Sequence, residues 1–258
     1  MDDLLISNVG VRFDGLWANK NISFAVDAGS ITAVIGPNGA GKSTLFNVIS
    51  GFIRPSEGHV KLGGTTISGM AADCVARQGI ARTFQIPEVC GDLSLFENVL
   101  VGAHRHIRGG LFGQIFGIKA ARISSRVAGE QVSELLATAN LWSIRDQLAQ
   151  TLPLGKVRLL EICRALASRP SILLLDEAAS GLNSQEAQEL ARFLQTLPRQ
   201  GITVVLIEHN IRFVMDLAQK IAVLNFGKLI SLGTPEEVRN SDAVVSAYLG
   251  HGSPDAKR

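Results

Sequence analysis

A glycine-rich segment near the N-terminus has the residue types that bind phosphate. It matches G-x-x-x-x-G-K-[ST], follows the apolar segment Ile31–Ile35 and precedes an expected helix over Lys42–Ile49. Its glycines allow a tight turn with inward N–H groups, and the helix N-terminus adds a positive dipole end. Lys42 would contact the β- and γ-phosphates, and the Ser43 hydroxyl could ligate Mg²⁺. The predicted phosphate-binding residues are Gly36, Pro37, Asn38, Gly39, Ala40, Gly41, Lys42, Ser43 and Thr44.

Two adjacent carboxylates could complete a hydrolytic site. The apolar segment Ile172–Leu175 is followed by Asp176 and Glu177, and a parallel sheet binds ligands at the carboxyl ends of its strands. Asp176 would lie beside Mg²⁺, and Glu177 would act as general base or orient the attacking water. His209 could reach the γ-phosphate, and Gln85 could touch Mg²⁺ or the water. Taken alone, His209 and Gln85 could each have only a structural role.

The elements that must position these residues alternate between strands and helices. Near-continuous apolar strands separated by helices predict a parallel sheet covered on both faces. The expected strands are Leu4–Val11, Ile22–Val26, Ile31–Ile35, Ile172–Asp176, Ile202–Glu208 and Ile221–Leu224, with a hairpin of His59–Leu62 and Thr65–Ile67. The expected helices are Lys42–Ile49, Val157–Ser168, Gln185–Pro198 and Ile211–Ala218, with a helical region from Asn98 to about Gln150.

Composition excludes several classes of protein. The 258 residues are 46% apolar, enough for a large core, and the formal charge of +2 implies no strong attraction to nucleic acid. Cys74, Cys90 and Cys163 form no CxxC pair, so we expect no disulfide framework or zinc site. We find no signal peptide, and no apolar run reaches the ~20 residues of a membrane helix. We therefore expect a cytoplasmic protein that would act at a membrane only through partners.

The order of these motifs resembles ABC-type ATPase subunits, and in particular the branched-chain amino acid transport group. The similar stretches are Gly36–Thr44, Ala81–Gln85, Leu159–Ala167, Ser180–Asn183, Ile207–His209, Gly233–Glu237 and Ala247–Gly250. The resemblance implies an α/β P-loop NTPase fold with a parallel-sheet core, an N-terminal antiparallel β sub-domain and a helical sub-domain. One ABC ATPase domain would span residues 1–250, with its core at 1–90 and 160–235, the helical part at about 91–159 and a flexible tail at 251–258.

The resemblance also assigns roles to residues that have no chemical signal of their own. Phe13 matches the aromatic residue that stacks on adenine, although it could simply be a strand core residue. Leu152–Lys156 matches the signature motif, so Gly155 would contact the ATP that a partner subunit holds. Ser180–Asn183 matches a dimer-contact loop.

The signature segment departs from the common Leu-Ser-Gly-Gly-Gln. Pro153, Leu154 and Lys156 replace Ser, the first Gly and Gln, which puts equal activity of the two composite sites in doubt. Lys156 could supply charge to the phosphate or face solvent. Asn183 and Ala178 stand where Asp and Pro are common.

The implied function is ATP binding and hydrolysis, with Mg²⁺, in a peripheral subunit on the cytoplasmic face of the plasma membrane. The implied partners are a second ABC ATPase subunit, identical or different, two transmembrane permease subunits and, indirectly, a periplasmic or extracellular substrate-binding protein. Such an assembly would import branched-chain or related amino acids. Gly109–Ile118 would contact the permeases or form a buried loop.

The sequence leaves two alternative protein classes open. A soluble ABC ATPase of iron–sulfur cluster assembly has a similar length. A phosphate-loop kinase or GTPase of another family would leave Leu152–Lys156 unexplained.

Overall fold

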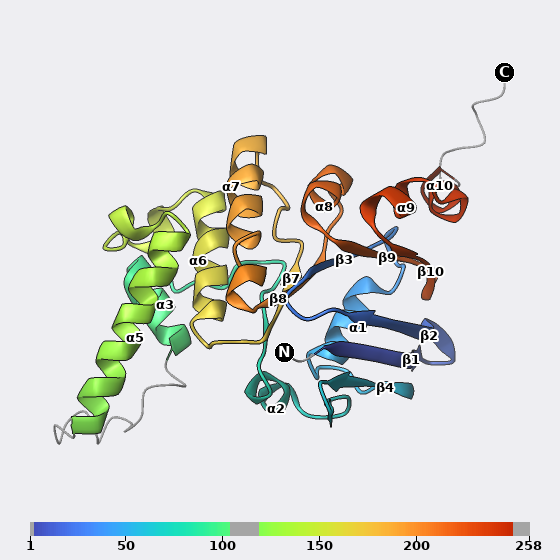
Figure 1. The fold of residues 1–258 in the computed structure, drawn as a ribbon, viewed down its shortest axis with the longest axis horizontal. Helices are drawn as coiled ribbons and strands as arrows, with labels where there is room; N and C mark the ends of the chain where they lie inside the picture. Colours follow the sequence, from blue (N-terminus) through green and yellow to red (C-terminus); the bar gives the residue numbers. More distant parts are fainter. Residues whose placement is uncertain (1–2, 104–118, 250–258) are drawn as a thin grey trace.

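The computed structural model describes residues 3–103 and 119–249 and centres on a six-stranded sheet (Figure 1). The strand order is β10-β9-β3-β8-β7-β6. The strands are β3 (Ile31–Ile35), β6 (Ile80–Arg82), β7 (Ile172–Asp176), β8 (Thr203–Ile207), β9 (Lys220–Asn225) and β10 (Lys228–Gly233). The first five of these pair in parallel, which confirms the predicted parallel core. The carboxyl ends of β3, β7 and β8 therefore meet at one edge of the sheet.

Strand β10 was not predicted and runs antiparallel to β9. The two strands are joined by Phe226 and Gly227, whose φ angles are 45° and 73°. A two-residue hairpin turn of type I′ requires positive φ at both positions, which glycine and asparagine adopt most easily. Phenylalanine at the first turn position is not a usual hairpin marker, and so the sequence pattern did not reveal this edge strand.

A second sheet is antiparallel, as predicted for the N-terminal part, and has the order β2-β1-β4-β5. Its strands are β1 (Leu4–Phe13), β2 (Leu16–Val26), β4 (Glu57–Leu62) and β5 (Thr65–Thr66). Strand β2 begins at Leu16 rather than at the predicted Ile22, because an Asp14-Gly15 turn with positive φ joins it directly to β1.

Two hydrophobic clusters cover the opposite faces of the six-stranded sheet. Leu173 and Leu175 of β7 belong to the cluster that includes the large helices, whereas Ile172 and Leu174 belong to the cluster that includes β1, β2, β4 and α1 (Lys42–Ile49). Alternate side chains of one strand thus enter two cores. Figure 1 shows α1 with the antiparallel sheet on one side of the central sheet, and α6 to α8 on the other. The prediction that both faces are covered is confirmed.

The remaining helices complete the chain. They are α2 (Ala72–Arg77), α3 (Leu95–Ala103), α5 (Lys119–Thr138), α6 (Leu154–Leu166), α7 (Ser184–Leu194), α8 (Ile211–Leu217), α9 (Pro235–Arg239) and α10 (Asp242–Leu249), with 3₁₀ turns at Trp142–Ile144, Ala149–Thr151 and Pro198–Gln200. Within the described residues, none of the helices has the length and apolarity needed to cross a membrane.

Helix α6 begins at Leu154, earlier than the predicted Val157, and Pro153 is its N-cap. The backbone at Pro153 is extended, with ψ 156°, and helical geometry begins at Leu154. The signature segment therefore forms the first turn of α6. Gly109–Ile118 and the tail at 251–258 lie outside the described residues, and the sub-domain boundaries at 91 and 159 stay predictions.

Candidate active site

The glycine-rich loop connects the carboxyl end of β3 to α1, and two of its positions require glycine. A Cβ on Gly36, where φ is 151°, would lie 2.1 Å from the Leu224 carbonyl oxygen. A Cβ on Gly41, where φ is 95°, would lie 2.3 Å from Asn19 Nδ2, which donates a hydrogen bond to the Gly41 carbonyl. The loop is thus packed against β2 and β9, and only backbone fits at these contacts.

Lys42 is buried at the start of α1, and its ammonium group lies across the loop. Nζ donates to the carbonyl oxygens of Gly36 at 2.8 Å and Pro37 at 2.9 Å. Burial lowers the pKa of Lys42, and the negative charges of Glu177 and Asp176 partly offset this effect. A buried cation held by neutral carbonyls would gain from a closer anion such as a phosphate.

The loop borders a cavity of about 220 Å³. Its lining residues are Ala18, Asn38, Gly39, Ala40, Gly41, Lys42, Ser43, Thr44, Glu177 and His209. The structure therefore brings the predicted phosphate loop together with one predicted carboxylate and the predicted histidine, which come from three strand ends.

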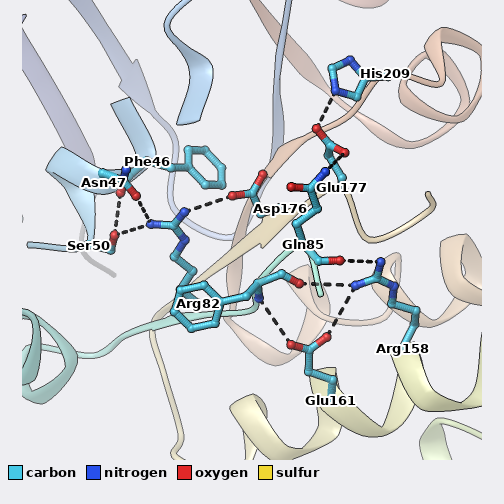
Figure 2. Close-up of polar contacts among 11 residues, drawn as sticks. Phe46, Asn47, Ser50, Arg82, Gln85, Arg158, Glu161, Asp176, Glu177 and His209 are labelled. Carbon is cyan, nitrogen blue, oxygen red and sulfur yellow. Dashed lines mark hydrogen bonds and ion pairs between the residues drawn. The ribbon is translucent and has the colours of Figure 1, made fainter. Parts of the chain in front are cut away.

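Glu177 lies where three segments meet (Figure 2). Its Oε1 is 2.5 Å from His209 Nε2, and its Oε2 accepts a hydrogen bond from Gln85 Nε2 at 2.9 Å. Glu177 follows β7, His209 lies two residues beyond β8, and Gln85 lies three residues beyond β6. The backbone of Glu177 has φ 53°, and its N–H donates to the Ile207 carbonyl. Glu177 thus contacts both Gln85, which was predicted to touch Mg²⁺ or the attacking water, and His209, which was predicted to reach the γ-phosphate.

Asp176 forms a buried ion pair with Arg82, a residue that the sequence did not mark. Arg82 Nη2 donates to Asp176 Oδ2 at 3.0 Å (Figure 2). The two residues are 94 positions apart and meet because β6 pairs with β7. The only sequence signal was a single basic residue three positions before Gln85.

Four other predicted residues do not line the cavity but adjoin residues that do: Gly36, Pro37, Gln85 and Asp176. Phe13 and Gly155 do not line it either and lie elsewhere. Phe13 is half exposed at the end of β1, on the same hairpin as Ala18, which does line it. The Gly155 N–H donates to Glu186 Oε1 at 3.3 Å, and Lys156 forms an ion pair with Glu189 at 2.5 Å. Lys156 thus contacts an acid of α7, which is neither of the two environments considered from the sequence.

The oxygen donors near the loop suit Mg²⁺. Ser43 offers an exposed hydroxyl, Asp176 a carboxylate and Gln85 an amide. In residues 3–103 and 119–249, no three His, Cys, Asp or Glu side chains form a group that could hold a metal ion. Mg²⁺ usually takes one or two protein oxygens and completes its shell with phosphate and water, so this sparse donor set fits it.

Glu208 is a second buried carboxylate beside the site. Its Oε1 accepts a hydrogen bond from the Ala179 N–H at 2.7 Å, and its side chain is almost fully enclosed. Burial raises the pKa of Glu208 from its ordinary value of 4.5 to about 7; repulsion from Glu177 adds to this rise, whereas hydrogen bonds and His209 oppose it. The folded protein therefore keeps a proton on Glu208 that the unfolded chain releases.

Stability should fall as the pH rises through this range, and Glu208→Gln should reduce that fall. The contribution of Glu208 is fully present below pH 4.5, where both states are protonated, and is lost by about pH 7. The pKa rises from 4.5 to about 7 and each unit corresponds to about 1.4 kcal/mol, so we expect the full loss to be about 3.5 kcal/mol. Denaturant unfolding of both proteins at pH 5 and pH 8 measures it. Equal pH dependence in the two proteins would contradict the assignment.

A glycine loop with a buried lysine after β3, together with carboxylates that follow β7 at the same edge of the sheet, defines a phosphate-loop nucleoside triphosphatase. The family model of ABC transporters matches residues 19–180, and one described as branched-chain amino acid ATP-binding cassette transporter matches residues 228–254. The chain belongs to the ABC transporter family as an ATP-binding subunit, and it is an ATPase.

Individual relatives agree with this assignment. The high-affinity branched-chain amino acid transport ATP-binding protein BraF of Pseudomonas aeruginosa is 39% identical, over 96% of this chain and 97% of BraF. LivG of Escherichia coli, named for the same role, is 36% identical over 96% and 97%. A crystal structure titled as the ADP conformation of an ABC transporter cassette superposes with a TM-score of 0.84 at 30% identity, covering 97% of this chain and 99% of that one.

These findings confirm the predicted family, fold class and nucleotide chemistry. They do not support the alternative of a soluble ATPase for iron–sulfur cluster assembly. Because the chain belongs to the ABC transporter family, it is not a kinase or GTPase of another phosphate-loop family.

Proposed function

We propose that this subunit powers the import of branched-chain or related amino acids by hydrolysing ATP on the cytoplasmic face of a membrane. The observation that carries the catalytic part is the contact of Glu177 with both Gln85 and His209. The relatives named for branched-chain amino acid transport support the substrate class. The substrate itself would be selected by partner proteins.

The phosphate loop would bind the triphosphate through its N–H groups, with Lys42 moving from the Gly36 and Pro37 carbonyls to the β- and γ-phosphates. Ser43 and Asp176, with Gln85, would hold Mg²⁺. When bound, Mg²⁺ neutralises charge on the phosphate oxygens. Glu177 would accept a proton from the attacking water or orient it, and His209 would fix the Glu177 carboxylate.

A second copy or a related ATPase would complete each site. The signature segment starts α6, so its helix dipole suits a phosphate held by the partner subunit, which would replace Glu186 as the acceptor of the Gly155 N–H. Leu154 is exposed there, as expected of a surface that a partner covers. Phe13, half exposed on the β1–β2 hairpin, would stack on the adenine ring.

Hydrogen bonds join the segment around Gln85 to α6. A movement at the site could therefore be transmitted to the helical part of the protein. Arg158 donates to the carbonyl oxygens of Phe84 at 3.3 Å and Gln85 at 2.8 Å, and Glu161 accepts from the Phe84 N–H at 3.3 Å (Figure 2). A separate cavity of about 210 Å³ lies between this segment, α3 and α6. We place the contact with the permease subunits at this cavity, where Glu88 and Arg164 offer charges of both signs.

The test is a pull-down from membranes with tagged Glu177→Gln protein and Mg-ATP, read by mass spectrometry. We expect a second ATPase and two multi-span permeases, because slow hydrolysis should prolong the closed assembly. The matched control is tagged Lys42→Ala, which should recover less of the second ATPase. Recovery of soluble scaffold proteins alone would contradict the transporter assignment and leave the ATPase chemistry unaffected.

A further inference from the structure

Arg82 is a buried cation that the proposed chemistry does not use. Its side chain is 9% exposed, and that of its partner Asp176 is 11% exposed. While Nη2 bonds Asp176, Nη1 donates to Asn47 Oδ1 at 2.7 Å and to Ser50 Oγ at 2.8 Å. Asn47 belongs to α1 and Ser50 is its C-cap. The guanidinium therefore bridges the end of β7 and the C-terminal end of the helix that begins with Lys42.

Three aromatic rings surround the same guanidinium group. Its central carbon lies 5.8 Å from the ring centroid of Phe46, 5.8 Å from that of Phe52 and 5.3 Å from that of Phe84. Cations are attracted to aromatic faces, and the rings also exclude water. The planar guanidinium group is hydrogen-bonded on two sides and surrounded by aromatic rings, so it has little conformational freedom. The ammonium group of a lysine could not reproduce this geometry.

Asp176 has a competing cation nearby. The Asp176 carboxylate and the Lys42 ammonium group are close enough to attract each other. Without Arg82, the Asp176 carboxylate would lose its hydrogen-bonded partner and be attracted toward Lys42. Arg82 does not line the phosphate cavity, so it would act on the site through its partners Asp176, Asn47 and Ser50.

We propose that Arg82 is a positioning residue that holds the Asp176 carboxylate in the orientation in which it can bind Mg²⁺. This inference rests on the proposed function, in which Asp176 is a magnesium ligand. Residues that hydrogen-bond to a metal ligand orient it, and their loss typically weakens metal binding by about 10- to 100-fold. The second attachment, to Asn47 and Ser50, couples that orientation to α1, which carries Ser43.

The experiment measures ADP binding to the full chain by calorimetry over a range of Mg²⁺ concentrations. ADP is not hydrolysed, so turnover does not enter. In Arg82→Met, the Mg²⁺ concentration for half-maximal enhancement of ADP binding should rise about 10- to 100-fold. ADP affinity without Mg²⁺ should change by less than about threefold, since the phosphate loop is intact. Arg82→Lys, which keeps the charge but not the fork, should lie between Arg82→Met and the unmodified protein.

Leu136→Ala is the control for lost stability, because Leu136 is fully buried in α5 and takes no part in the site. It should lower the melting temperature without changing the Mg²⁺ requirement. If Arg82→Met does not fold, Asn47→Ala with Ser50→Ala removes the second attachment, together with the hydrogen bond from Ser50 Oγ to the Phe46 carbonyl, and should raise the requirement several-fold. An unchanged or lower requirement in the folded Arg82 or double variant would overturn the proposal. Failure of the unmodified protein to bind ADP, or to respond to Mg²⁺, would instead refute the proposed function.

Discussion

Replacing Glu177 with glutamine should lower ATP turnover by about 10²-fold or more and leave nucleotide binding intact. Glutamine has nearly the same shape as glutamate but cannot accept the proton of the attacking water. The present contacts of the carboxylate, with His209 Nε2 at 2.5 Å and Gln85 Nε2 at 2.9 Å, depend on its two acceptor oxygens. One of these contacts would have to change, which adds a loss of orientation to the loss of basicity. Steady-state phosphate release and fluorescent nucleotide titration measure the two effects separately.

Glu57→Gln is the matched control for this variant. Glu57 is exposed at the start of β4, and its replacement makes the same change in charge and shape away from the cavity. Turnover in that variant should equal the unmodified value. A Glu177→Gln protein that hydrolyses ATP at the normal rate would remove Glu177 from the mechanism and leave His209 as the next candidate base.

Lys42→Ala should weaken ATP binding by about 10- to 100-fold. A hydrogen bond from a charged donor contributes about 1.5–3 kcal/mol, which converts to this range of Kd. We attribute the expected loss of ATP affinity to the missing ammonium group, because Lys42 is buried against the loop and its pKa is lowered by desolvation. A phosphate would restore the favourable environment that this ammonium lacks. Equilibrium titration with a fluorescent ATP analogue measures the change.

Lys61→Ala removes the same charge from β4, outside the residues that line the cavity. Its affinity should match that of the unmodified protein. Loss of binding in both variants would point to the net charge of the chain, and loss in neither would show that Lys42 does not contact the phosphates. Thermal melting without nucleotide separates these results from unfolding.

Local segments of this fold could be predicted well from the sequence. Helix α1 and strand β7 have the predicted bounds, Lys42–Ile49 and Ile172–Asp176. Each element has a strong apolar pattern and a clear boundary signal. The glycine loop marks the start of α1, and two acidic residues mark the end of β7. The phosphate loop and the two acids are contiguous motifs, so their chemistry could be interpreted without knowing the three-dimensional fold.

Contacts that depend on strand order could not be predicted. The Arg82–Asp176 pair exists because the three-residue strand β6 lies beside β7, and so short a strand has no measurable periodicity. The Arg158 bonds to the Phe84 and Gln85 carbonyls likewise join positions more than 70 residues apart. In both cases the donor was visible as a basic residue, but its partner was fixed only by the tertiary fold.

The left-handed backbone conformation of Glu177 has a cost in stability. A residue other than glycine at φ 53° typically costs on the order of 1–2 kcal/mol, which glycine would avoid. Here the conformation is held by the N–H bond to Ile207, and it turns the carboxylate toward His209 and Gln85. Selection for stability alone would favour glycine at this position. Under the proposed role of Glu177 in activating water, the carboxylate would be retained at this position at a cost in stability.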